Sequence, residues 1–295
     1  MKIDAGIISS DAREAGISAK NLEDAGYDGA FTYEGPHDPF LPLVGAALST
    51  EKIELMTSIA VAFARNPMVL ANLGFDLNLL SKGRFILGLG SQIKPHITKR
   101  FSMPWSSPAA RMKEMISAIQ AIWDCWQNGT KLDFRGEFYS HTLMTPFFTP
   151  ASNPYGTPKI YVAAVGPLMT KAVAESADGL LVHPFHTVKY MEEITLPGVK
   201  EGIDGLIATN TSSFHNHFHK PSGISGKPLF ELSTKILKKV KGLVGQDFPI
   251  IASGGVMDRK SYSKKIDSGA DLVQVYTGLI YKGPQLIQDI LTLKD

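Results

Sequence analysis

Short apolar runs alternate with amphipathic segments along most of this 295-residue chain. Apolar residues recur at helical spacing at Val69, Leu70, Leu73, Leu77 and Leu80. The run GRFILGLG that follows is almost wholly apolar, which is typical of a strand covered on both faces. Regular succession of strands and helices predicts an α/β fold with a parallel sheet, in which ligands bind beyond the carboxyl ends of the strands.

The length of the chain fits one large α/β barrel or two modest domains, and the apolar runs give about nine candidate strands, whereas the usual (β/α)8-type TIM barrel closes with eight. The expected strands end at Ser9, Glu34, Ala60, Gly90, Ala164, His183, Thr209, Ser253 and Tyr276. Three arrangements stay open: a displaced strand, a barrel that closes with nine strands, or strands divided between partner chains. Because a barrel has no free edge, we expect residues 3–9 and 272–276 to form neighbouring parallel strands.

The alternation of strands and helices breaks after the fourth predicted strand. Residues 91–158 combine a polar and aromatic loop, an amphipathic helix from Ala109 to Trp126 and a proline-rich stretch. An insertion of this size at the carboxyl end of a strand usually forms part of a pocket wall.

Charge and composition exclude several classes of partner. With 30 basic and 28 acidic residues, the net charge of +2 gives no reason to expect nucleic acid. No run approaches the ~20 apolar residues of a membrane span, and the acidic fourth residue argues against a secretory signal. The single cysteine, Cys125, reads as a buried thiol, so we expect a cytoplasmic protein. The loop histidines His215, His217 and His219 lack a carboxylate or cysteine beside them, so we expect no metal site.

A glycine turn follows the predicted strand in PIIASGGVMD. Gly254 and Gly255 would let the backbone approach a ligand closely, and the helix that begins at Asp258 would direct N–H groups toward an anion. If the strands are parallel neighbours, Tyr276 and Thr277 arrive beside this turn. The stretch therefore predicts a phosphate site, and the alternative is an ordinary turn of a βαβ unit.

The motifs GLIATNT, SGISGKPLF, PIIASGG and VQVYTGLIYKGP follow one another in the last third of the chain. They resemble the C-terminal part of class 2 dihydroorotate dehydrogenase, an FMN enzyme built on a (β/α)8 barrel. The resemblance implies that Asn210 and Thr211 bind substrate, and Ser222 departs from the usual glycine. It also implies that FMN is held by Thr209, Gly226, Ser253, Gly254, Gly255, Tyr276 and Thr277.

The first two-thirds of the chain carries a second set of motifs: GYDGAFTYEGPHDPF, LMTSIAVAFARNP, GRFILGLGSQIKPH and YVAAVGPLMTKAVAESADGLLVHPF. They resemble the luciferase-like family of flavin and deazaflavin oxidoreductases. The resemblance implies a cis peptide bulge at Ser58 and Ile59 behind the flavin ring, and a phosphate loop at Val165 and Gly166. It also places an acidic residue at Glu34.

The histidine that the family's sugar-phosphate dehydrogenases carry directly after this acid is replaced here by Gly35. His37, two residues further on, is therefore our candidate general acid or base, together with Glu34. His183 ends a predicted strand, which would place it at the mouth of the barrel.

The sequence thus predicts one barrel over residues 1–295, made of a luciferase-like segment (1–190) and a dihydroorotate dehydrogenase-like segment (200–295), as in a natural or engineered chimera. The expected function is hydride transfer to or from an unidentified small molecule, with FMN as cofactor or 8-hydroxy-5-deazaflavin coenzyme as the alternative. Two other functions stay open: dihydroorotate dehydrogenase itself, and a scaffold that binds flavin phosphate without turnover. Assembly into a homo-oligomer also stays open.

Overall fold

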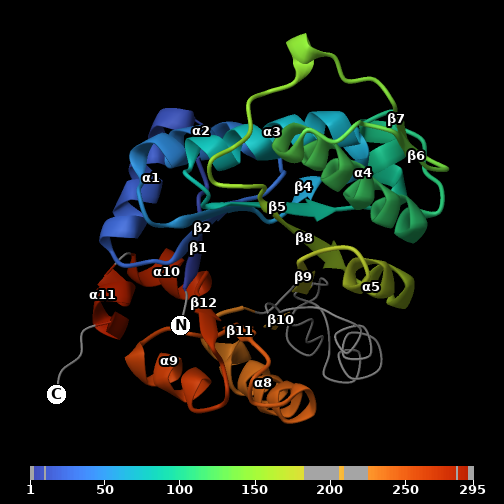
Figure 1. Ribbon diagram of the computed structural model, residues 1–295. Helices are drawn as coiled ribbons and strands as arrows, with labels where there is room; N and C mark the ends of the chain where they lie inside the picture. Colours follow the sequence, from blue (N-terminus) through green and yellow to red (C-terminus); the bar gives the residue numbers. More distant parts are fainter. Residues whose placement is uncertain (1–2, 10, 183–205, 209–224, 284, 292–295) are drawn as a thin grey trace.

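A curled parallel sheet forms the centre of the protein (Figure 1). The computed structural model describes residues 3–9, 11–182, 206–208, 225–283 and 285–291. Neighbouring strands succeed one another in chain order: β1 (Asp4–Gly6), β2 (Gly29–Thr32), β3 (Glu54–Thr57), β5 (Phe85–Gly90), β8 (Lys159–Ala164), β9 (Gly179–Val182), β10 (Leu206–Ala208), β11 (Ile250–Ser253) and β12 (Leu272–Gln274). The short β4 (Ala60–Val61) follows β3 and pairs with β5. All nine predicted strands are present.

Helices cover the outer face of the sheet (Figure 1). They are α1 (Ala12–Asp24), α2 (Phe40–Ser49), α3 (Pro67–Leu80), α4 (Pro108–Asn128), α5 (Pro167–Ala174), α8 (Phe230–Val244), α9 (Arg259–Ile266), α10 (Thr277–Lys282) and α11 (Gln285–Leu291). Strand residues such as Leu87, Val162 and Ile250 are fully buried, as a doubly covered sheet requires. Within the described ranges, no helix is long and apolar enough to cross a membrane.

The two parts of the chain share this sheet without a break. Strand β9 pairs with β10 through Leu180 and Leu206, which joins the N-terminal part to the C-terminal part. At the other end of the strand order, β12 lies beside β1 (Figure 1). The first and last strands are therefore neighbours, as expected, while hydrogen-bonded pairing between them stays a prediction.

The segment 91–158 contains an ordinary connecting helix as well as irregular structure. Helix α4 packs against both α3 and α5, and Trp123 Nε1 donates to the carbonyl oxygen of Ala71 on α3 at 3.0 Å. Cys125 is buried on this helix, as predicted. The irregular parts flank α4 and contain η2 (His96–Arg100), β6 (Phe134–Arg135), β7 (Ser140–His141) and η3 (Pro146–Phe148).

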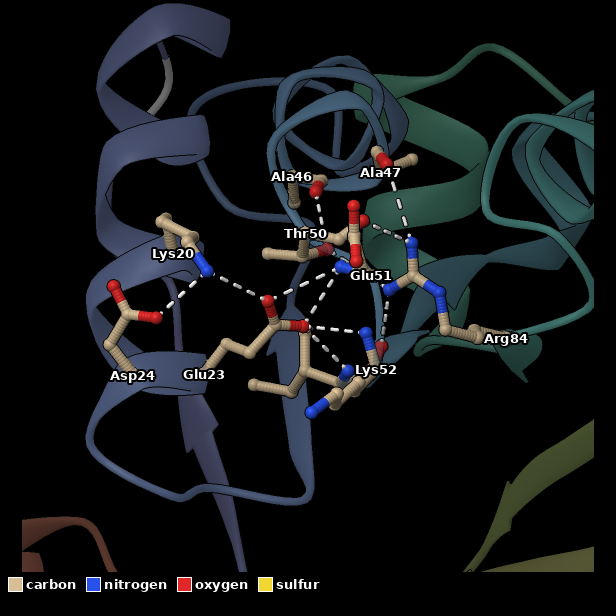
Figure 2. Close-up of polar contacts among 10 residues, drawn as sticks. Lys20, Glu23, Asp24, Ala46, Ala47, Thr50, Glu51, Lys52 and Arg84 are labelled. Carbon is tan, nitrogen blue, oxygen red and sulfur yellow. Dashed lines mark hydrogen bonds and ion pairs between the residues drawn. The ribbon is translucent and has the colours of Figure 1, made fainter.

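A carboxylate fixes the turn that leads into β3 (Figure 2). Glu23, near the end of α1, accepts hydrogen bonds from the backbone N–H groups of Glu51, Lys52 and Ile53 at 2.9, 2.6 and 3.0 Å. Burial raises the pKa of Glu23, but these N–H groups outweigh it and bring the pKa down to about 2. The Glu23 carboxylate is therefore ionised at neutral pH and acts as a structural joint between α1 and β3.

Candidate functional site

A small polar hollow opens at the carboxyl ends of β11 and β12. It is formed where the turn after β11 meets the start of α10. We call this hollow the cradle. Its lining residues are Gly226, Ser253, Gly254, Gly255, Val256, Gln274, Val275, Tyr276, Thr277 and Gly278. The fold thus brings together six of the predicted cofactor residues from three separate stretches of the chain.

The glycines of the cradle have backbone conformations and packing that other residues do not fit. Gly226, Gly254 and Gly255 have φ values of 73°, 102° and 84°. A Cβ added at Gly255 would lie 2.5 Å from the Cα of Phe230 at the start of α8, and one at Gly226 would lie 2.9 Å from Cγ2 of Thr277. The backbone is therefore bare at the cradle, as close binding of phosphate oxygens requires.

The peptide between Gly254 and Gly255 has a fixed orientation. Ser233 Oγ on α8 donates to the carbonyl oxygen of Gly254 at 2.8 Å. Because the trans peptide is planar, the N–H of Gly255 points opposite to this carbonyl group, away from Ser233. Lys227 lies next to Gly226 on η5 (Lys227–Leu229), and no carboxylate lines the cradle in the described part of the chain. These groups fit a phosphate monoester.

A cis peptide joins Ser58 and Ile59 between β3 and β4, as the resemblance to luciferase-like enzymes implied. Glycines on β5 make room for it: a Cβ at Gly90 would lie 2.9 Å from Cδ1 of Ile59, and one at Gly88 would lie 1.6 Å from the carbonyl oxygen of Thr57. Since the strands are parallel, this bulge lies at the same edge of the sheet as the cradle.

Glu34, the predicted acid, is engaged in a buried network beside the bulge. Its carboxylate accepts hydrogen bonds from the N–H of Val61 and from Arg65 Nη1, both at 2.6 Å. Arg65 Nη2 also contacts Asp38 at 2.7 Å. The side chain of Glu34 is only 5% exposed, so its carboxylate holds the backbone just beyond the cis peptide. We did not expect Arg65 from the sequence, because its partner lies 31 residues away.

His37 is exposed and lines a second hollow at the carboxyl ends of β1 and β2. Ser9, Tyr33 and Asp38 line the same hollow. Arg100 on η2 donates to the carbonyl oxygen of Gly35 at 2.8 Å, which brings part of the segment 91–158 to this loop. The two hollows have no lining residue in common.

The remaining predicted residues lie elsewhere or outside the described part of the chain. Val165 and Gly166 precede α5, where a Cβ at Gly166 would meet nothing within 4 Å, and neither lines the cradle. The residues outside the described ranges are His183, Thr209, Asn210 and Thr211. Over the described ranges, no cluster of histidine, cysteine and carboxylate groups could hold a metal ion.

Two family models match the chain in series. The model of luciferase-like monooxygenase matches residues 3–204, and that of dihydroorotate dehydrogenase matches residues 181–293. The matches overlap around β9, the strand that pairs with the first described strand of the C-terminal part. This confirms the two-part composition predicted from the motifs.

Curated relatives divide in the same way. An uncharacterized protein of Mycobacterium tuberculosis is 54% identical over 203 residues, which cover 69% of this chain and 59% of the relative. A dihydroorotate dehydrogenase (quinone) of Dichelobacter nodosus is 45% identical over 130 residues, which cover 41% of this chain and 38% of the relative. The chain thus spans about three-fifths of the length of the mycobacterial relative, and less of the second.

Solved structures share the fold over almost the whole chain. The monooxygenase RslO1 of Streptomyces bottropensis has a TM-score of 0.67 at 16% identity, covering 98% of this chain and 97% of its own. The coenzyme F420 dependent tetrahydromethanopterin reductase of Methanopyrus kandleri has a TM-score of 0.64 at 16% identity, with coverage of 98% and 96%. At such identities the likeness concerns the fold alone.

Proposed function

Since the chain belongs, through residues 3–204, to the luciferase-like monooxygenase family, we propose that it is an FMN-dependent oxidoreductase that transfers hydride to or from a small molecule. The observation that carries the proposal is the cradle of glycines and backbone N–H groups, set at the same edge of the sheet as the cis peptide of Ser58 and Ile59. The turn at residues 253–255, from the dihydroorotate dehydrogenase-like part, and the bulge at Ser58 and Ile59, from the luciferase-like part, thus lie at the same edge of the sheet.

In this proposal the chain binds and orients the cofactor, which supplies the two-electron chemistry when bound. Ser253, Gly254, Gly255, Tyr276 and Thr277 hold the phosphate. Glycine turns suit this task, because a ligand oxygen can approach backbone N–H groups with no side chain between them.

The bulge at Ser58 and Ile59 supports the ring of the cofactor. Glu34 acts here as a positioning residue, because its carboxylate is bound to Val61 and Arg65. His37 is the candidate for proton transfer, since it is exposed at the hollow beside the loop that carries Glu34.

FMN is the first choice of cofactor because the cradle belongs to the dihydroorotate dehydrogenase-like part. The alternative is the deazaflavin coenzyme, for which Val165 and Gly166 would be the phosphate loop. The position of Gly166 at the N-terminus of α5 suits an anion. We place it second because Gly166 lines neither the cradle nor the hollow of His37.

For the fold, we propose that the sheet closes into a single barrel over residues 1–295, with β1 and β12 as its last pair. The nearness of these strands supports closure. The cradle lies at the end of β12, and the hollow of His37 lies at the ends of β1 and β2. Closure of the barrel between β12 and β1 would therefore place the two hollows side by side.

A second candidate is a protein that binds flavin phosphate without turnover. It is favoured by the engagement of Glu34, which leaves His37 as the only predicted acid or base in the described part of the chain whose side chain is exposed.

The decisive experiment is to denature the purified protein and to identify the released cofactor by absorbance and mass. We expect FMN, and a released deazaflavin would move the assignment to the alternative loop. Protein purified without cofactor would be titrated with FMN, and failure to bind would contradict the proposal. Reduction of the bound flavin by supplied hydride donors then separates an enzyme from a binding protein.

A further inference from the structure

A buried lysine lies beneath the cradle. Lys265, on α9, has 0% of its surface exposed. Its Nζ donates to Ser233 Oγ at 2.6 Å and lies 5.3 Å from the centre of the Phe230 ring. A buried ammonium group is costly unless it is paired, so its presence next to a proposed anion site calls for a reason.

The contacts of Lys265 lead directly into the turn of the cradle. Because the lysine donates to Ser233 Oγ, the serine hydroxyl is free to donate in turn, and the carbonyl oxygen of Gly254 lies 2.8 Å from it. The carbonyl oxygen of Phe230 lies 3.0 Å from the same hydroxyl. The lysine, the serine and the Gly254–Gly255 peptide therefore form one chain of dipoles, whose far end is the N–H of Gly255.

We propose that Lys265, acting through Ser233, is the positioning residue of the cradle: it fixes the Gly254–Gly255 peptide and supplies the positive charge that favours a phosphate monoester dianion. This inference rests on the proposed function, because it takes the phosphate of the cofactor as the ligand. Lys265 does not touch the ligand in this arrangement, since it lies behind Ser233.

The charge of Lys265 is poised to respond to an anion. Burial lowers its pKa to about 7, and the nearby carboxylate of Glu231 on α8 acts in the opposite direction. A dianion in the cradle would stabilise the protonated form, so the phosphate is bound more weakly as the pH rises above about 7. Helix α9 packs against α8, α11 and β12, of which β12 has no titratable side chain. The other titratable groups on these helices are Lys235, Lys238, Lys239, Lys241, Arg259, Lys260, Tyr262, Lys264 and Asp289.

The test compares FMN with riboflavin, which differs by the phosphate alone. Fluorescence titration of the wild-type protein and of Lys265→Met gives the affinity of both flavins at pH 7 and pH 9. Methionine is chosen because an apolar residue of similar size often replaces a buried charge without loss of stability. We expect Lys265→Met to bind FMN about tenfold more weakly and riboflavin equally well. The preference of the wild-type protein for FMN should fall from pH 7 to pH 9, and that of the variant should stay constant.

Two further variants keep the outcome interpretable. Lys260→Met removes an exposed charge from the same helix and should leave both affinities unchanged. Ser233→Ala cuts the connection to Gly254, should also reduce the preference for FMN, and replaces Lys265→Met if that variant does not fold.

The possible failures can be told apart. If the wild-type protein does not prefer FMN over riboflavin, the proposed function of the cradle fails, and this inference with it. If the wild-type protein prefers FMN, and Lys265→Met keeps both this preference and its pH dependence, only the role of Lys265 is refuted.

Discussion

Two turns of this molecule, the one before β3 and the one after β11, differ in whether the chain itself supplies an anion to the turn. In the turn before β3, the carboxylate of Glu23 accepts from three consecutive residues, as Figure 2 shows. In the turn after β11, the described lining of the cradle contains no carboxylate. In the first turn, a carboxylate of the chain itself binds the N–H groups, and the result is a structural connection between α1 and β3. In our proposal, the second turn takes its anion from a ligand.

The buried charges of the two regions differ in the same way. Hydrogen bonds lower the pKa of Glu23 to about 2 and so favour its charged form. Burial lowers the pKa of Lys265 to about 7 and so disfavours its charged form. A charge that is fully satisfied within the fold holds the structure together. A charged group whose hydrogen bonds and ion pairs do not offset its burial can respond to a ligand. The direction of the pKa shift therefore helps to distinguish structural from functional charged groups, without reference to any family.

The largest effect that we expect is a low rate of dihydroorotate oxidation. The C-terminal part should bind a flavin phosphate but should not by itself catalyse this reaction. The dihydroorotate dehydrogenase match covers only residues 181–293, and the two described candidates for an acid or base, Glu34 and His37, lie outside it. Loss of positioned proton transfer costs on the order of 100- to 10,000-fold. We expect orotate formation by flavin-loaded protein, with a quinone or dye as acceptor, to be slower than an ordinary ~10 per second by at least that lower factor. Turnover near the ordinary rate would show that the N-terminal part supplies a base.

The second prediction concerns the buried ion pair between Glu34 and Arg65 in the N-terminal part. Arg65→Met leaves the carboxylate of Glu34 buried without its cation, which should lower the free energy of unfolding by about 3–5 kcal/mol. Denaturant unfolding measures the loss. The control Arg65→Lys keeps the charge but not the planar fork that reaches both Glu34 and Asp38, and should lose less. Glu34→Gln combined with Arg65→Met should recover part of the loss, and no recovery would refute the pairing.

The third prediction tests the cradle by a substitution that places a carboxylate from the chain in its lining. Thr277→Asp places a carboxylate in the lining at the first residue of α10, where a negative charge suits the helix. FMN should bind roughly ten- to a hundredfold more weakly, whereas the neutral control Thr277→Asn, which keeps a polar side chain, should lose much less affinity. Gly255→Asp is less informative, because its Cβ alone would lie 2.5 Å from the Phe230 backbone. Equal FMN affinity of the two Thr277 variants would argue against a phosphate in the cradle.

The smallest effect concerns the Glu23 joint. Glu23→Gln keeps the shape but removes the charge that three N–H groups bind, so it should cost about 1–3 kcal/mol at neutral pH. The pKa of Glu23 falls on folding, from 4.5 to about 2. Its contribution is therefore complete above about pH 4.5 and is lost as the pH falls through about 2. Denaturant unfolding at pH 7 and at pH 3 should show the gap between wild type and variant narrowing. A gap that is independent of pH would contradict this account.

The sequence by itself determined the elements whose causes are local. Apolar runs ended by glycine or polar residues located the nine strands, because a buried strand needs only its own residues to be apolar. Asp258 was recognised as the start of a helix for the same reason, since a cap bonds within three residues. The glycines of the cradle were predicted as well, because their positive φ angles are a property of the turn itself.

Only the tertiary structure decided what those elements do together. Arg65 reaches Glu34 across 31 residues, and Lys265 reaches Ser233 across 32, and no periodicity in the sequence marks either pair. Both lysine and arginine read as exposed in a sequence, because charged residues are rarely buried without partners. The fold supplied these partners. Glu34, predicted as a catalytic acid, binds Val61 and Arg65 in the structure, and Lys265, which the sequence did not single out, lies beneath the cradle. Partners distant in sequence meet only when the sheet has curled, so a residue's own neighbours cannot reveal them.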